Sequence, residues 1–449
     1  MLKNAQIWLP GYLASRKRGD FVSPPHVFFC FVDHYEPLWA NPTQETARAR
    51  TRHWRENYPK FANQFHDVDG RPPQHTFFFP AEEYRPEFLD DLAQLSRHGY
   101  GEVEIHLHHR NDTAENLAAT LEEFKVKLRS HGFLTEDRAL GPAVSGQQSA
   151  PTPSRGKSSA FSVQGSKFKV PQSDEVPERS RRGISAQPSV SDLPSPNSQS
   201  SRCAPVSDRA LQPTAGLQSP HLSPQLSTRN SQPLLRYGFI HGNWCLDNSR
   251  RDGDWCGVNN ELQVLRETGC YADFTLPSAP SDTQTRKVNA IYYATDDPLR
   301  PKSHDTGVDV RVGGQATGDL LIMQGPLALN WKRRKWFCLP RIEHADVAGH
   351  TPPTADRIDL WVRQRIGVVG KPDWIFVKVH THGCQENNFS TALGAAAARM
   401  HEYLAQQPFQ LHYVTAREVF NLIKAAEAGL TGDPNQYRDF VLPPPPIRQ

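Results

Sequence analysis

The sequence predicts an α/β fold: a deformed (β/α) barrel that is interrupted by one long disordered insertion. Short apolar runs of strand length alternate with segments of helical periodicity, an order typical of a parallel sheet with helical crossovers. Residues 141–232 contain 21 Ser and 12 Pro but neither Trp nor Tyr. A segment of this composition has too few apolar groups to offset the entropy lost on folding, so we expect it to be a disordered surface loop.

The elements follow from periodicity. An apolar run of strand length begins the series, and helices are recognised by apolar residues three and four apart. Before the insertion we expect strands at 26–32 and 103–107 and helices at 88–95 and 117–128. After the insertion we expect strands at 235–240, 288–293, 375–379 and 412–414, and helices at 391–404 and 416–428.

The domain organisation follows from where the polar motifs lie. A chain of 449 residues suggests about three domains at ~150 residues each. Motifs expected to share one site, however, occur both before and after the insertion. We therefore expect residues 1–140 and 233–449 to be two parts of one barrel of 449 − 92 = 357 residues, from which residues 141–232 loop out.

Charge and cysteine content restrict the partners and the compartment. The net charge is +3, too small to indicate nucleic acid as the main partner. The sequence has no apolar window of about 18 residues for a transmembrane segment, and no secretion signal at its N-terminus. Seven cysteines without a CxxC pair are typical of reduced thiols, so we expect a cytoplasmic protein.

Polar clusters end three of the expected strands. Because the carboxyl ends of parallel strands share one face, these clusters are expected to meet. Histidines and carboxylates that converge in this way are typical ligands of a catalytic divalent metal, and we expect Zn²⁺ with an open position for water. The residues are Asp33 and His34 after the first strand, His106, His108 and Asp112 after the second, and His380 and His382 after a late one.

Each of these residues has a structural alternative. Asp33 alone is most often a turn residue or helix cap, and Asp112 precedes a helix that it would cap. A single histidine pair on a strand is as often a hydrogen-bonded pair as a metal site. The coincidence of three clusters favours a shared metal or catalytic site.

The order of these motifs resembles the polysaccharide deacetylase family, the NodB-homology carbohydrate esterases. The first family motif ends a strand in two aspartates, a base and a metal ligand; here Asp33 matches the base and His34 replaces the second aspartate. The second motif, His-x-x-x-His, is matched from His108 to Asp112, with Asp112 in place of the second histidine. The resemblance implies a NodB-like barrel whose divalent metal is bound by His34, His108 and Asp112.

Two further motifs complete the resemblance. Arg236 matches the arginine that orients the base, and the residues after it, His241, Asn243 and Trp244, suit hydrogen bonding to and stacking on a sugar. The last family motif ends in the histidine that acts as general acid. It is matched by residues 377–380, and since a second histidine follows, either His380 or His382 is the acid.

The leading hypothesis is a metal-dependent hydrolase of C–N bonds that deacetylates an N-acetylated, or O-acetylated, sugar in polysaccharide metabolism. The expected substrate is an amino sugar or a lipid-linked or nucleotide-sugar precursor. The alternative is a non-catalytic carbohydrate-binding or assembly protein on the same barrel, with tryptophans such as Trp244 and Trp255 as stacking platforms. A glycosidase using Asp33 and Glu36 is disfavoured because two acids so close in sequence do not flank a bond well.

Overall fold

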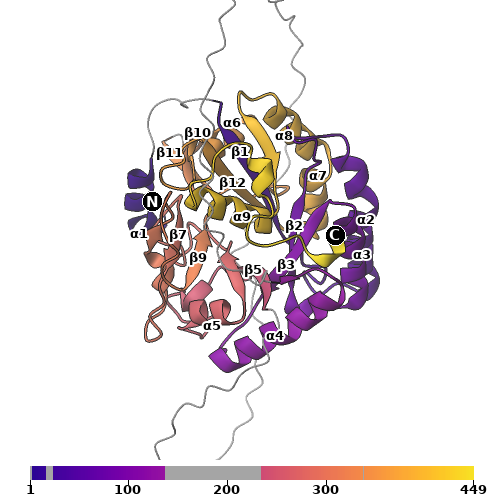
Figure 1. Ribbon diagram of the computed structural model, residues 1–449, viewed down its shortest axis with the longest axis horizontal. Coiled ribbons are helices and arrows are strands. Elements are labelled where there is room, and N and C mark those ends of the chain that lie inside the picture. Colours follow the sequence, from indigo (N-terminus) through magenta and orange to yellow (C-terminus); the bar gives the residue numbers. More distant parts are fainter. Residues whose placement is uncertain (1–2, 17–23, 137–233, 337) are drawn as a thin grey trace, which may run out of the picture. The chain divides into compact units, whose positions relative to one another are not determined.

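The computed structural model describes residues 3–16, 24–136, 234–336 and 338–449 (Figure 1). The insertion expected at residues 141–232 lies outside the described residues. The described residues form a mixed α/β fold with a large, mostly parallel sheet, so the α/β class expected from the sequence is confirmed.

The helices formed by the described residues are α1 (Ala5–Ser15), α2 (Gln44–Ala62), α3 (Pro86–Arg97), α4 (Ala114–Ser130), α5 (Glu261–Glu267), α6 (Ala355–Arg363), α7 (Phe389–Ala392), α8 (Ala395–Ala405) and α9 (Ala416–Glu427). The strands of the large sheet are β1 (His26–His34), β2 (His75–Pro80), β3 (Gly101–Leu107), β4 (Thr135–Glu136), β5 (Leu235–His241), β6 (Cys270–Asp273), β7 (Ile291–Ala294), β8 (Val308–Asp309), β9 (Leu320–Met323), β12 (Trp374–Thr381) and β13 (Gln410–Tyr413). A separate antiparallel pair is formed by β10 (Ala328–Lys335) and β11 (Leu339–Glu343).

The strands of the large sheet lie in the order β12–β1–β2–β3–β5–β6–β9–β7–β8. Every neighbouring pair from β12 to β9 is parallel, whereas β7 is antiparallel to both β9 and β8. Two strands share one edge of β1: β13 pairs with residues 26–29 and β2 with residues 31–34. The carboxyl ends of β12, β1, β2, β3 and β5 therefore meet at one end of the sheet.

Residues on both sides of 137–233 belong to this sheet. Ile105 of β3 is the partner of Phe239 of β5 in a parallel pair. The short strand β4 pairs antiparallel with the beginning of β5, where Thr135 is opposite Arg236. Strands that precede residues 137–233 and strands that follow them thus belong to a single sheet.

The side chains of β1 alternate between two hydrophobic clusters. Phe28, Cys30 and Val32 pack in one cluster with the apolar residues of α9, and we call this side of the sheet the α9 face. Val27, Phe29 and Phe31 pack in another cluster with residues of α6 and α8. By the two-residue period of a strand, His34 continues the series on the α9 face and Asp33 points to the opposite face.

The same alternation orients β3 and β12. Val103, Ile105 and Leu107 pack against α2, α3 and α4, so that the even-numbered residues of β3, including His106, point to the α9 face. On β12, Trp374 and Phe376 lie in the cluster with α9, and His380 continues that series. The final polar residues of three strands therefore share a face.

Helix α9 lies near the centre of the described unit, with strands on several sides of it (Figure 1). Its start is fixed by a capping box, in which Thr415 accepts from the backbone N–H of Glu418 and the Glu418 carboxylate accepts from that of Thr415. Arg417 makes a two-point ion pair with Glu102 of β3, at 3.1 and 2.9 Å. This helix covers one end of the α9 face, opposite the strand ends that carry the histidines.

Two expected elements differ from those observed. The helix expected at 391–404 is broken into α7 and α8, because Gly394 between them has an extended backbone, with φ −114° and ψ −159°. The strand expected from residue 288 begins only at Ile291. Asn289 has a φ of 54°, and its side chain accepts from the N–H and donates to the carbonyl of Leu327, which keeps it out of the strand.

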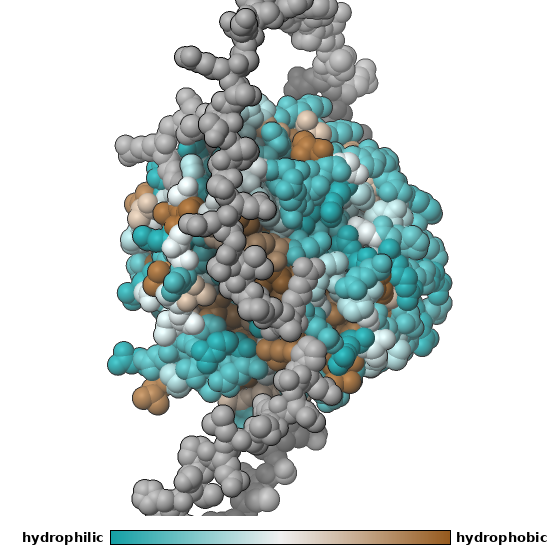
Figure 2. Space-filling view, viewed as in Figure 1, coloured by the Kyte–Doolittle hydropathy of each residue, from teal (hydrophilic) through white to brown (hydrophobic). Residues whose placement is uncertain are grey.

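The surface seen in Figure 2 is mostly hydrophilic, especially over α2 and α3. Large apolar side chains with high exposure are few and scattered, such as Trp39, Leu299 and Trp336. Among the described residues, none of the helices combines the length and the apolar character needed to traverse a bilayer.

Candidate active site

Three parallel strands bring histidines together at their carboxyl ends. His34 is the last residue of β1, and His106 and His380 are the penultimate residues of β3 and β12. The ring centroid of His34 lies 4.8 Å from that of His106 and 6.2 Å from that of His380. The strand ends therefore form a buried histidine cluster on the α9 face.

The contact between His106 and Glu36 requires a proton or a metal ion. Nδ1 of His106 lies 3.1 Å from the carbonyl oxygen of Ile240, which only accepts, so this nitrogen carries the proton of the neutral ring. Nε2 is then an acceptor, yet it lies 3.2 Å from Oε1 of Glu36. Two acceptors at this distance repel one another unless a proton lies between them, on the ring or on the carboxyl group, or a metal ion binds both. Histidines that ligate metals commonly donate their second N–H to a backbone carbonyl in this way.

His34 completes a set of three potential ligands. One ligand atom from each of His34, Glu36 and His106 lies within 4.8 Å of the others, and all three side chains are buried. Within the described part of the chain, Nδ1 of His34 and Oε2 of Glu36 have no hydrogen-bond partner. An unpaired buried polar atom costs about 1–3 kcal/mol, and a divalent cation would satisfy both atoms. The donor set of two imidazoles and one carboxylate fits a divalent first-row metal.

The protonation states of this cluster also suit metal binding. Burial, and then the neighbouring histidines, hold the pKa of His34 well below its usual value. Burial raises the pKa of Glu36, but its contact with His106 and the charges of the nearby histidines outweigh burial and lower it overall. Neutral imidazoles beside an ionised carboxylate are the forms that ligate a metal.

His382 and Trp244 cover His34. The ring of His382 stacks on that of His34 with centroids 4.7 Å apart, and Trp244 lies 5.1 Å from His34 and from His380. His382 is half-buried, whereas His380 is buried. Of the two histidines expected as acids, His382 is therefore the one that a substrate can reach.

His380 is supported by residues that sequence reasoning missed. Its Nε2 lies 3.8 Å from Oδ1 of Asp346, and Oδ2 of that carboxylate accepts from the Thr351 hydroxyl at 2.6 Å. The ring of His344 stacks on His380 at 5.7 Å. Asp346 and His344 follow β11 in an irregular segment, where neither strand period nor motif spacing singles them out.

His108, expected as a metal ligand, lies at the rim of the cluster. Its Nδ1 is 2.5 Å from Oε1 of Glu82, and its Nε2 is 3.5 Å from Oε1 of Glu36. Burial lowers the pKa of His108, but the hydrogen bond and charge of Glu82 outweigh burial and raise it. Because β3 ends at Leu107, the strand period no longer orients His108, and His106 takes the position expected for it.

The structure places Asp33, which is expected to be the base, outside the histidine cluster. Its side chain points away from His34, to the opposite face of β1. Oδ1 accepts the backbone N–H of Gly383 at 2.6 Å, and Oδ2 lies 3.5 Å from Nδ1 of His75. Trp54 of α2 donates to the carbonyl of the same Gly383. Asp33 is thus a buried residue that positions the segment carrying His382.

Two other expected members of the site lie elsewhere. Asp112 is not a ligand alongside His34: its Oδ1 accepts from Thr113 N–H and the Asn116 side chain near the start of α4. Its Oδ2 lies 3.2 Å from Nδ1 of His109. Arg236 does not meet Asp33, because strands β2 and β3 lie between β1 and β5.

The three residues expected to bind the sugar lie in two different places. Trp244 belongs to the cluster. His241 instead faces His109, with ring centroids 4.6 Å apart, in a second group of potential ligands that also contains Cys256 and Glu261. Asn243 links the two places through its backbone, since its N–H is donated to Nδ1 of His241 and Trp244 follows it.

A third group of potential ligands, Asp67, Asp69 and His412, is neutralised within the protein. Arg438 pairs with both carboxylates, at 3.5 and 2.6 Å, and His412 Nδ1 lies 2.8 Å from Oδ2 of Asp69. This group is an ion-pair network.

No known family model matches the chain, no curated protein matches its sequence, and no solved structure matches it. The functional assignment therefore depends on the geometry of the site.

Proposed function

We propose that the protein is a metal-dependent hydrolase that deacetylates a sugar, as the resemblance to the polysaccharide deacetylases implies. The observation that carries this proposal is the contact between His106 and Glu36, two acceptors 3.2 Å apart beside the unpaired Nδ1 of His34. In place of the ligands expected from the sequence, we assign the metal to His34, Glu36 and His106, with Zn²⁺ favoured by this donor set. When bound, the ion would lower the pKa of a water and polarise the acyl carbonyl.

The acid and base are assigned to the late histidines. His380, oriented by Asp346 at 3.8 Å, takes the proton of the attacking water. His382 protonates the departing amine, because it is half-buried and stacks directly on His34. Asp33 positions His382 through its hydrogen bond with Gly383 and does not touch the substrate.

The substrate-binding surface is assigned to a cavity next to this site. The cavity has a volume of about 530 Å³, and His344, which stacks on His380, is in its wall. Lys335 and Arg341 also line it, and neither has an ion-pair partner among the described residues. With Trp336 as an aromatic wall, this lining suits a sugar that carries a phosphate, such as a nucleotide-linked or lipid-linked amino sugar.

The barrel remains part of the proposal. Beyond β8, Val312 donates to the carbonyl of Val369 and Val369 donates to that of Val310, both at 2.9 Å. Phe376 of β12 donates in turn to the carbonyl of Ile366. These bonds support a path from the last strand of the sheet, through residues 366–369, back to the first, as a deformed barrel requires.

The proposal is tested by acetate release from N-acetylated sugars with and without a diphosphate, together with elemental analysis of the purified protein. We expect zinc-dependent release that is abolished by chelation and restored by zinc. His106→Ala should lose activity and the equivalent of metal bound at this cluster, whereas the exposed His66→Ala should keep both. Sugar binding that survives chelation, without turnover of any acetylated sugar, would favour the non-catalytic alternative.

A further inference from the structure

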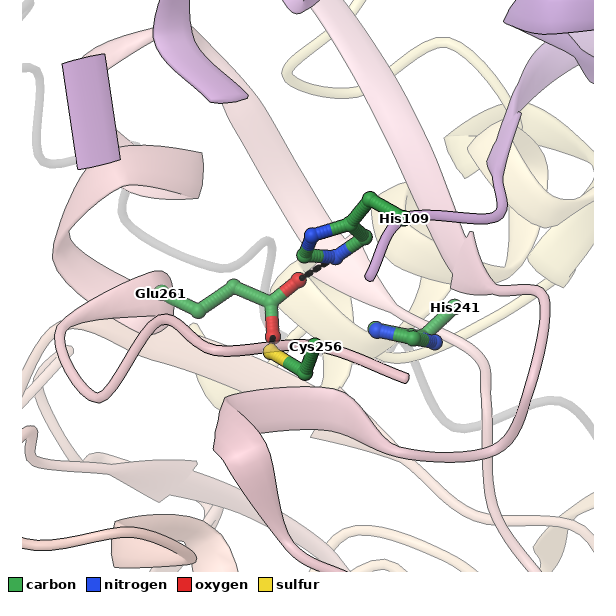
Figure 3. Close-up of side chains that lie close together, drawn as sticks. All are labelled: His109, His241, Cys256 and Glu261. Atoms are coloured by element: carbon green, nitrogen blue, oxygen red, sulfur yellow. Dashed lines mark hydrogen bonds and ion pairs between the residues drawn. The ribbon is translucent and has the colours of Figure 1, made fainter. Parts of the chain in front are cut away.

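A second group of potential ligands lies outside the proposed active site (Figure 3). One ligand atom from each of four buried residues lies within 4.8 Å of the others; the residues are His109, His241, Cys256 and Glu261. They come from four separate segments: the turn after β3, the end of β5, an irregular loop, and the first residue of α5. Because the four residues are far apart in the sequence, no local spacing motif predicts that two imidazoles, a thiol and a carboxylate meet here.

His109 lies between two carboxylates. Its Nε2 is 3.1 Å from Oε1 of Glu261, and its Nδ1 is 3.2 Å from Oδ2 of Asp112. A neutral imidazole has one donor nitrogen, so one of these two contacts needs an additional proton or a cation. A carboxylate beside the outer nitrogen of a histidine is the usual support of a metal ligand, and Asp112 has this position.

Cys256 has both donors and acceptors around its sulfur. Its Sγ accepts the backbone N–H of Asn248 at 3.3 Å and that of Val258 at 3.5 Å, and its thiol lies within donating distance of Oε2 of Glu261, at 3.4 Å, and of the Val258 carbonyl, at 3.7 Å. Two N–H groups directed at one sulfur favour the thiolate, which is the form that binds a metal.

His241 supplies an unpaired nitrogen. The residue is fully buried, its Nε2 has no hydrogen-bond partner among the described residues, and that end of the ring faces Cys256 in Figure 3. The backbone N–H of Asn243 is donated to Nδ1 at 3.3 Å. Ligation through Nε2 requires the ring proton to move to Nδ1, so this long hydrogen bond is given up when a metal binds.

We propose that His109, His241, Cys256 and Glu261 form a structural site for a divalent zinc-like cation, separate from the His34 cluster. Four buried protein ligands would fill the usual coordination number of a structural zinc site and would leave no position for a substrate. The ion would join the turn after β3 to the loop 242–260, where Trp244, Asp247 and Trp255 have positive φ. This loop carries Trp244, and the ion would therefore hold that side chain against His34.

Cobalt(II) distinguishes this site from the catalytic one, because only this group contains a cysteine. The full-length protein would be stripped, loaded with Co²⁺ and examined for the near-ultraviolet sulfur-to-cobalt charge-transfer band. We expect the band in wild type, in the His34→Ala variant and in the matched control Cys270→Ser, a buried cysteine of β6 outside the group. Cys256→Ser should lose the band and about one equivalent of zinc per chain.

The wild-type spectrum decides the proposal even if Cys256→Ser does not fold. A cobalt-loaded wild-type protein without a thiolate band would overturn it, as would a band of equal intensity in folded Cys256→Ser. Loss of deacetylase activity in His34→Ala with the band retained would show that the two sites are independent. Conversely, a thiolate band in a protein without hydrolase activity would leave this site in place and contradict only the proposed function.

Discussion

The ring of His382 stacks on that of His34 with centroids 4.7 Å apart, and the residues beside them in the chain are joined as well. Asp33 accepts the backbone N–H of Gly383 at 2.6 Å. Since Asp33 and His34 point to opposite faces of β1, the two contacts fix the segment after β12 from both sides of the strand. The position of His382 thus depends on a carboxylate that lies outside the histidine cluster.

Asp33→Asn should retain activity within about threefold of wild type, because the amide oxygen still accepts the Gly383 N–H; this is less than ~1 kcal/mol in transition-state free energy. Asp33→Ala leaves that N–H unpaired and should lower the free energy of unfolding by about 1–3 kcal/mol. Acetate release and chemical denaturation measure the two effects. A loss of ~100-fold in a well-folded Asp33→Asn would instead identify Asp33 as the base.

His382→Gln should lower kcat by about 100-fold or more while KM and the zinc content stay unchanged, because the leaving amine loses its acid. His380→Gln is the comparison, since it removes the partner of Asp346 without removing the ring that stacks on His34. Steady-state kinetics on an acetylated sugar, with elemental analysis of each variant, separate the roles. Unchanged kcat in His382→Gln would contradict the assignment of His382 as the acid.

Replacing both Lys335 and Arg341 by alanine should raise KM about tenfold or more for a diphosphate-linked sugar, the equivalent of ~1.4 kcal/mol of lost binding. KM for the uncharged sugar should not change, and the effect should weaken as salt is added. Lys332→Ala is the matched control, because Lys332 is exposed on β10 and does not line the cavity. If the double variant and wild type have the same KM for the diphosphate-linked sugar, Lys335 and Arg341 do not bind a phosphate of the substrate.

Arg417→Met should lower the free energy of unfolding by about 3–5 kcal/mol, since it leaves the buried Glu102 carboxylate without its principal partner. Arg48→Met provides the same chemical change at the surface, where the pair with Glu87 is half-exposed, and should cost less than about 1 kcal/mol. Urea denaturation of both variants checks the contrast. Similar losses in the two would show that α9 is not held by the Arg417 pair.

His401 should make the protein less stable as the pH falls. Burial lowers the pKa of His401 to about 3, below its unfolded value of about 6.5, so its stabilising contribution is complete above pH 6.5 and is lost progressively towards pH 3. By pH 5 this amounts to about 2 kcal/mol relative to pH 7. His401→Gln should flatten the dependence of the free energy of unfolding on pH, and the exposed His66→Gln should not. Parallel pH profiles of wild type and His401→Gln would contradict this.

The sequence anticipates the general fold because the hydrophobic period is strong where strands are buried, as in residues 26–32. The sequence also predicts that His34, His380 and Trp244 lie close together, since the carboxyl ends of parallel strands meet. It does not anticipate the choice of His106 over His108. That choice depends on where β3 ends, which is decided by pairing with β2 and β5 and not by local pattern.

The position of Asp33 outside the histidine cluster, in contrast, is predictable from the sequence. The two-residue period of a strand places the side chains of Asp33 and His34 on opposite faces of β1. Cys256 and Glu261 have no comparable signal. They lie in an irregular loop and at the start of a short helix, and only tertiary packing brings them to His109 and His241. Long-range contacts of this kind are what local sequence patterns do not contain.

The pairing of Glu136 with Leu235 has a consequence for the history of this protein. The chain leaves the sheet and returns to it at neighbouring positions, about 5 Å apart, the spacing of paired strands. Closing a loop costs only ~0.6 kcal/mol more for each doubling of its length, so this junction accepts segments of very different lengths at nearly constant stability. At this junction a segment can be gained, lost or exchanged while both groups of potential metal ligands keep their positions, and a foreign domain can be grafted there.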